Sequence, residues 1–208
     1  MKLFDLDGTL SDSNGLWADI DGAFLERRGL ESTEEYAHTV GHSIFPVAAQ
    51  FTKDYYGLDM SPQSIMDEWM ALAREAYRQV SLKPGAAEYL ERCHAEGQPM
   101  AMLTACVPEL CLTVLERYGL GRYFSQVIFA QELGLEKRNP LVYRQATALL
   151  GVAPEDCTFY EDAPANCAAA KSLGMTVVGV RDPFYAKYEA ELRRTCDRYI
   201  ESFEELLG

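Results

Sequence analysis

From residue 84 onward, the sequence alternates between short apolar segments and amphipathic segments with helical spacing. This alternation predicts βαβ units and a parallel sheet, because parallel strands need a crossover connection. Four of the predicted strands follow one another with helices between them, and a fifth lies at the N-terminus. The five strands are predicted at Lys2–Leu6, 99–103, 126–130, 157–161 and 176–180.

Residues 14–81 separate the first predicted strand from the others, and they contain no strand signal. Ser32 to Glu35 has the spacing of a capping box, and Ser61-Pro62 combines an N-cap with a proline at the first helical position. The simplest interpretation is an all-helical cap domain, 14–81, inserted into an α/β core formed by 1–13 and 82–208. The predicted core is a doubly wound parallel sheet, which is a Rossmann-like fold and binds ligands at the carboxyl ends of its strands.

Charge and cysteine content restrict the classes of partner and the compartment. The 208 residues carry a formal net charge of −13, which argues against nucleic acid or an anionic membrane as the main partner. No apolar run is long enough to span a membrane, and Asp5 and Asp7 interrupt the N-terminus where a signal peptide would be apolar. The 6 cysteines contain no C-x-x-C pair, so we expect free thiols and a cytoplasmic protein. A monomer or weak homodimer is also expected.

The run Asp5-Leu6-Asp7-Gly8-Thr9 is the strongest functional signal. Asp5 ends a buried strand, where a carboxylate is costly unless it is paired or bound to a metal. Asp7 follows in the turn, so both carboxylates can face one point, one as nucleophile and the other as acid or base. The alternative is an acidic turn without function, since Asp-Gly is common in turns.

Two other strand ends and one loop carry polar residues of interest. Thr104 follows the second core strand, where its hydroxyl and nearby N–H groups could hold phosphate oxygens or simply cap a helix. Lys137, with Arg138 beside it, lies in a loop where a lysine is usually only solvated. Glu161 and Asp162 end another strand and offer oxygen ligands to a hard cation, although Asp162 could also cap the following helix.

Together these motifs resemble the haloacid dehalogenase-like superfamily, in the branch with a helical cap that includes the beta-phosphoglucomutase-like phosphatases. The resemblance covers essentially the whole chain and implies phosphoryl transfer through an aspartyl-phosphate. It implies that Asp5 attacks phosphorus, that Asp7 protonates the leaving oxygen and then activates water, and that the Asp7 carbonyl binds magnesium. It also implies that Thr104 and the Ala105 backbone hold the phosphate, although the family usually has a polar residue at the latter position.

The same resemblance implies that Lys137 neutralises charge in the transition state, with Arg138 as the alternative where the family often has proline. It places Asp162 on a magnesium ion and Glu161 on the metal or its water, with Asn166 behind them. Asp12 corresponds to a polar residue at the entrance of the cleft.

In the helical segment the resemblance is unspecific. Six polar residues there could contact a substrate or simply lie at the surface, namely His38, His42, Lys53, Arg74, Tyr77 and Arg78. Trp69 is expected in a core. The predicted partner is therefore a small phosphorylated metabolite, and the predicted activity is a magnesium-dependent phosphatase. Alternatives are a sugar-phosphate mutase, a dehalogenase, a phosphonate hydrolase that would need Lys53, and a non-catalytic binding protein.

Overall fold

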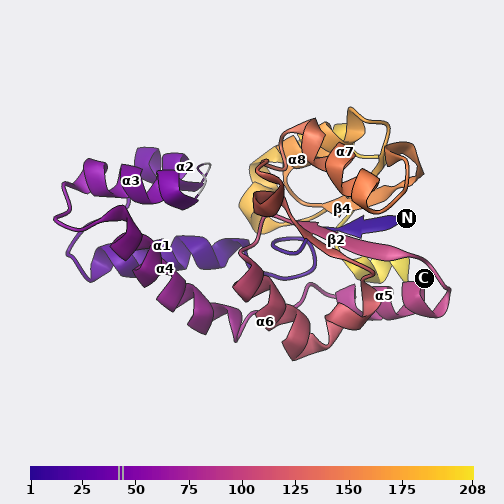
Figure 1. Cartoon of the computed structure of the whole chain (residues 1–208), viewed down its shortest axis with the longest axis horizontal. Helices are drawn as coiled ribbons and strands as arrows, with labels where there is room; N and C mark the ends of the chain where they lie inside the picture. The colour runs from indigo at the N-terminus through magenta and orange to yellow at the C-terminus, as the bar shows by residue number, and fades with distance from the viewer. Residues whose placement is uncertain (42, 44) are drawn as a thin grey trace. The chain divides into compact units, whose positions relative to one another are not determined.

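The computed structural model describes residues 1–41, 43 and 45–208, without the side chain of residue 38. The chain divides into two compact units. The first combines Met1–Asn14 with Val80–Gly208 and contains every described strand, and the second is Gly15–Gln79. Figure 1 shows helices α1 to α4 in the second unit, in indigo to magenta.

A six-stranded parallel sheet forms the centre of the first unit, in the order β3-β2-β1-β4-β5-β6. This is the order of a doubly wound sheet, with the N-terminal strand in the middle. The predicted α/β fold class is therefore confirmed. The short edge strand β6 (Arg198–Ile200) was not predicted. The strands are β1 (Lys2–Phe4), β2 (Met100–Thr104), β3 (Val127–Phe129), β4 (Thr158–Glu161), β5 (Thr176–Val180) and β6 (Arg198–Ile200).

Helices cover both faces of this sheet (Figure 1). Leu3 and Phe4 point to opposite faces, as neighbouring strand residues must. Leu3 belongs to a buried cluster with side chains of α7 and α8, whereas Phe4 packs in an aromatic group with Tyr89 and Phe203. The helices are α5 (Ala86–Ala95), α6 (Pro108–Tyr118), α7 (Pro140–Leu149), α8 (Pro164–Lys171) and α9 (Glu189–Thr195).

The second unit is built from helices with their own apolar core. Trp69 is buried as expected, and its ring packs against the rings of Phe24 and Phe45. Ser61 caps its helix as predicted. The other cap lies one residue later than the predicted Ser32, because α2 begins at Glu34 and the Thr33 hydroxyl accepts the Tyr36 N–H. Among the described helices, none combines the length and apolar character that a membrane span requires. The bounds are α1 (Asn14–Glu26), α2 (Glu34–Gly41), α3 (Phe45–Tyr56) and α4 (Pro62–Tyr77).

Two segments connect the units, and within the first unit they are hydrogen-bonded to each other. The Asp12 N–H donates to the Ser81 carbonyl at 2.9 Å, and the Lys83 N–H donates to the Leu10 carbonyl at 2.8 Å. The buried Lys83 ammonium also binds Asp182, which follows β5, at 2.5 Å. The connections are thus anchored at the same edge of the sheet as the strand ends.

Candidate active site

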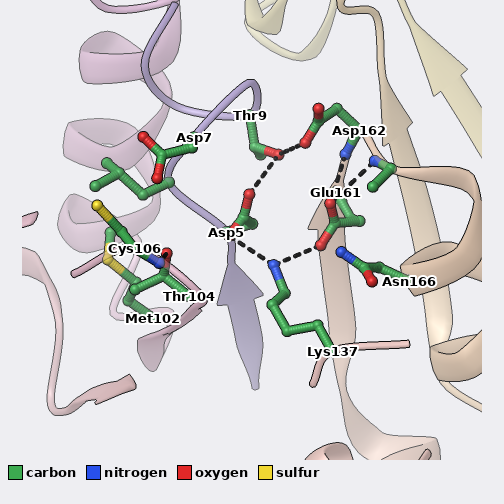
Figure 2. Close-up of polar contacts among 12 residues, drawn as sticks. Asp5, Asp7, Thr9, Met102, Thr104, Cys106, Lys137, Glu161, Asp162 and Asn166 are labelled. Carbon is green, nitrogen blue, oxygen red and sulfur yellow. Dashed lines mark hydrogen bonds and ion pairs between the residues drawn. The ribbon is translucent and has the colours of Figure 1, made fainter. Parts of the chain in front are cut away.

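The carboxyl ends of three adjacent strands bring the predicted acidic residues together. Asp5 directly follows β1, Glu161 ends β4 and Asp162 follows it, and β2 on the other side ends at Thr104. Figure 2 shows Thr104 on one side of Asp5 and the acids Glu161 and Asp162 on the other, as the strand order requires. All four side chains are buried. The fold therefore gathers groups that lie far apart in the sequence.

Lys137 is the cation of this cluster. Its Nζ lies 2.6 Å from Asp5 Oδ1 and 2.6 Å from Glu161 Oε2, and the residue is only 4% exposed. Arg138 is exposed and pairs with Glu136 at 2.5 Å. The structure thus places the predicted cation, Lys137, against the acids, and not the alternative Arg138.

Each carboxylate oxygen of Glu161 has a partner: backbone N–H groups contact one oxygen, and the Lys137 ammonium contacts the other. Oε1 accepts the N–H groups of Asp162 at 3.2 Å and Ala163 at 3.0 Å, while Oε2 contacts Lys137. This arrangement fixes the side chain of Glu161 and holds the lysine between two acids.

Asp162 is also held at both oxygens. The Thr9 hydroxyl lies 2.9 Å from Asp162 Oδ1 and 3.4 Å from Asp5 Oδ2, so it bridges two acids. The Asn14 amide donates to Asp162 Oδ2 at 2.6 Å. The sequence analysis did not select Asn14, because an asparagine at a helix start is ordinary and its contact depends on the path of the turn.

The turn after β1 places Asp7 beside the cluster. Gly8 has φ +79°, which glycine adopts without strain. The N–H of Gly8 donates to the Ser11 carbonyl at 2.9 Å, which closes the turn. Asp7 Oδ1 accepts the Ser13 hydroxyl at 2.6 Å. Asp7 is half-buried, so its carboxylate has more access to water than that of Asp5.

Of the remaining predicted residues of the core, some lie beside the acidic cluster, whereas Asp12 is engaged elsewhere. Thr104 Oγ1 accepts the Cys106 N–H at 3.0 Å, so that N–H is engaged, and Ala105 is exposed between them. Asn166 is half-buried and lies near Glu161 and Lys137 in Figure 2. Asp12, in contrast, is exposed and its carboxylate accepts the Lys83 ammonium at 3.0 Å.

Burial and crowding shift the protonation equilibria of the cluster. Burial raises the pKa of Asp5 to about 7, and the Lys137 charge opposes this shift. Burial, together with the negative charges of Glu161 and Asp5, raises the pKa of Asp162 well above its usual value. Burial alone would lower the pKa of Lys137, but the two carboxylates beside it raise the value above normal. The single positive charge of Lys137 therefore does not compensate the negative charges of the neighbouring acids.

This donor set fits a divalent metal ion. Asp5, Glu161 and Asp162 each offer a carboxylate oxygen, and these atoms lie within 4.8 Å of one another. Three carboxylates and the Lys137 ammonium carry a formal charge of −2, which a divalent cation would balance. Oxygen-only ligands are typical of magnesium and calcium sites.

The candidate substrate-binding residues of the helical unit have varied environments. Lys53 is half-buried near the end of α3, and Arg74 lies exposed on α4. Tyr77 is buried, and its hydroxyl accepts the Trp17 indole N–H at 3.2 Å. Arg78 is exposed and pairs with Glu75 at 3.1 Å. His42 and the side chain of His38 lie outside the described part of the chain.

Comparison with known proteins supports the chemical interpretation. A family model described as haloacid dehalogenase-like hydrolase matches residues 3–174, which is most of the chain and confirms the predicted resemblance. A probable pseudouridine-5'-phosphatase of Drosophila melanogaster is 29% identical over 187 residues, covering 87% of this chain and 81% of the relative. Hexitol phosphatase B of Escherichia coli K12 is 28% identical over 189 residues, covering 87% and 83%. The family match and the phosphatase relatives support the predicted phosphoric monoester hydrolase.

Solved structures show the same architecture. A haloacid dehalogenase family hydrolase from Deinococcus radiodurans R1, solved with bound phosphate and sodium, has a TM-score of 0.73 and is 26% identical. The match covers 99% of this chain and 92% of that chain. The likeness therefore includes both units of the present chain.

Proposed function

Because the chain belongs to the haloacid dehalogenase-like hydrolases, we propose that it is a magnesium-dependent phosphatase that hydrolyses a small phosphomonoester through an aspartyl-phosphate on Asp5. The observation that carries the proposal is the Lys137 ammonium between Asp5 and Glu161, with Asp162 beside them at the buried strand ends. Phosphoryl transfer needs such positive charge near the nucleophile, because the transferred group is itself anionic.

The first half-reaction uses Asp5 and Asp7. An Asp5 oxygen forms a bond to phosphorus while the bond from phosphorus to the substrate oxygen breaks. Asp7 gives its proton to that leaving oxygen, so an alcohol departs. The Ser13 hydroxyl, which donates to Asp7 Oδ1 at 2.6 Å, orients this side chain for the proton transfer.

The second half-reaction returns the enzyme to its starting state. Asp7, now ionised, takes a proton from a water molecule whose oxygen attacks phosphorus, and the bond to Asp5 breaks. Lys137, the Thr104 hydroxyl and the exposed backbone at Ala105 are proposed to hold the phosphate oxygens throughout.

Magnesium, when bound, would neutralise phosphate charge and orient the phosphoryl group against Asp5. We propose that Asp5, Asp162 and the Asp7 carbonyl hold it. We assign to Glu161 chiefly the placement of Lys137, because its Oε2 lies 2.6 Å from the Lys137 ammonium. All six cysteines are free thiols, in keeping with a proposed cytoplasmic location.

The decisive test is phosphate release from a panel of phosphomonoesters by purified protein with magnesium. The panel includes p-nitrophenyl phosphate, polyol phosphates, nucleoside monophosphates and sugar phosphates. We expect hydrolysis of at least one member by the wild type, and none by Asp5→Asn. Isomerisation of a sugar phosphate without release would favour the mutase, and inactivity toward every ester would favour a binding protein.

A further inference from the structure

Asn14 connects the metal-site carboxylate of Asp162 to the first residue of a helix. Its Nδ2 donates to Asp162 Oδ2 at 2.6 Å, and Asp162 is 1% exposed. Asn14 is also the last residue of the first compact unit and the first residue of α1, which continues through the second unit. The position of this amide is therefore set by the helix that leaves the active site.

Gly8 leaves the space in which this contact forms. A Cβ atom at Gly8 would fall on Asn14 Nδ2 and on Asp162 Oδ2, closer than real Cβ atoms come. The glycine is thus needed for the approach of the amide to the carboxylate as well as for its positive φ. The backbone of Gly8 thus packs closely against the contact between Asn14 and Asp162.

The Asn14 amide stabilises the Asp162 carboxylate in an environment crowded with negative charge. Asp162 lies beside Glu161 and Asp5, and one carboxylate oxygen of each of the three lies within 4.8 Å of the others. Thr9 holds one of its oxygens and Asn14 holds the other. Without the amide, Asp162 Oδ2 would lose a donor, and repulsion would favour rotation of the carboxylate away from the other two acids.

We infer that Asn14 is a positioning residue for magnesium, which keeps the Asp162 carboxylate turned toward Asp5. The inference rests on the proposed function, because it takes Asp162 as a metal ligand. Groups that hydrogen-bond to metal ligands typically change metal affinity by about 10–100-fold when they are removed. Asn14 does not itself touch the reacting atoms in this scheme.

The test is isothermal titration of magnesium into metal-stripped full-length protein, for the wild type and two Asn14 variants. Asn14→Leu keeps the approximate volume and removes the donor. Asn14→Ser keeps a residue favoured at helix starts, but its hydroxyl is shorter. We expect the Kd for magnesium to rise by about 10–100-fold in both variants. The magnesium concentration for half-maximal hydrolysis should rise in parallel, with kcat recovered at saturating magnesium.

Ser61→Ala is the matched control, since it removes a helix cap in the second unit and leaves the acidic cluster intact. It should lower stability without changing the Kd for magnesium. If either Asn14 variant binds magnesium as tightly as the wild type, the inference is wrong, although the proposed function stands. A wild type that binds no magnesium would overturn both.

Discussion

The Lys137 ammonium lies 2.6 Å from Asp5 Oδ1, at the end of the central strand β1. Both residues are buried, so each charge depends on the other for compensation. The lysine reaches Asp5 from the loop before α7, and Glu161 holds it from the opposite side. The nucleophile proposed here is thus supplied with a fixed counter-charge before substrate arrives.

Lys137→Met should therefore impair both stability and activity. Removal of one partner from a buried ion pair costs about 3–5 kcal/mol, because the remaining charges are left uncompensated. We expect a loss of that size in the free energy of unfolding measured in EDTA, and hydrolysis near background. The double variant Lys137→Met/Glu161→Gln should recover part of the stability but none of the activity. Equal stability of the single and double variants would contradict this account.

The metal is tested by chelation and by Asp162→Asn, which is nearly isosteric and removes one negative charge. EDTA should abolish hydrolysis, and added magnesium should restore it. In the variant, magnesium should bind much more weakly, because an anionic oxygen is replaced by a neutral amide. Titration calorimetry and hydrolysis at several magnesium concentrations measure both effects. Undiminished turnover in excess chelator would exclude the proposed role of the metal.

The role of Asp7 is tested through the leaving group. An alkyl alkoxide is a poor leaving group and needs a proton, whereas an aryl oxide such as p-nitrophenolate does not. General acid catalysis contributes about 10²–10⁴-fold. In Asp7→Asn, dephosphorylation also slows for both substrates, so the formation of the aspartyl-phosphate must be followed in single turnovers. That step should be slowed far more for an alkyl phosphate; equal slowing would contradict the assignment.

Much of this arrangement was predictable from the sequence for a simple reason. Parallel strands bring their carboxyl ends to one edge, so Asp5, Thr104 and Glu161 were expected at that edge once the strands were recognised. The order β2-β1-β4 in the structure makes them neighbours. Edge strand β6 was missed because three residues, beginning with an exposed arginine, carry no apolar alternation. Its pairing with β5 is a long-range property.

Side-chain contacts were less predictable than strand ends. The sequence favoured Lys137 but kept Arg138 as an alternative, since adjacent loop residues differ in direction only after the loop is folded. Asn14 was missed for the same reason: its contact with Asp162 depends on the turn at Gly8. Tyr77, one of six candidates for a substrate contact or a surface position, proves to be buried, and its hydroxyl accepts the Trp17 indole N–H.

The ion pair between Arg28 and Glu68 should make the free energy of unfolding decrease as the pH falls into the acid range. Hydrogen bonds from Arg28 lower the pKa of Glu68 below its usual 4.5, and the two contacts are 2.5 and 3.1 Å long. A lowered folded-state pKa adds stability above the unfolded value and loses it as pH falls through the folded value. Glu68→Gln should thus lower the free energy of unfolding at pH 7 by about 0.5–1 kcal/mol, a small amount because the side chain is partly exposed. The loss should become progressively smaller below pH ~4.5, where Glu68 becomes protonated.

Chemical unfolding at several pH values, followed by circular dichroism, measures this dependence. Glu75→Gln is the control, because Glu75 pairs with Arg78 at the surface and both side chains are more than half exposed. Its effect should be close to zero throughout. A cost for Glu68→Gln that stays constant down to pH 3 would show that the pair contributes through packing alone.

The last prediction concerns substrate specificity, which we assign to the polar residues of the helical unit. A contact with the part of the substrate that does not react should matter for the physiological phosphate and not for p-nitrophenyl phosphate, which lacks that part. Lys53→Ala and Arg74→Ala should therefore lower kcat/KM for the best substrate of the panel by at least about tenfold, the effect of losing one charged hydrogen bond. Hydrolysis of p-nitrophenyl phosphate should change little.

Tyr77→Phe separates packing from binding in the same experiment. It removes only the hydroxyl that accepts the Trp17 indole, so it should reduce stability and leave the ratio of the two kcat/KM values unchanged. Arg78→Ala should also leave that ratio unchanged, since Arg78 is engaged with Glu75 at the surface. If all four variants reduced both activities in equal proportion, the helical unit would contribute structure rather than specificity. Discrimination between phosphomonoesters would then have to come from the ends of the core strands.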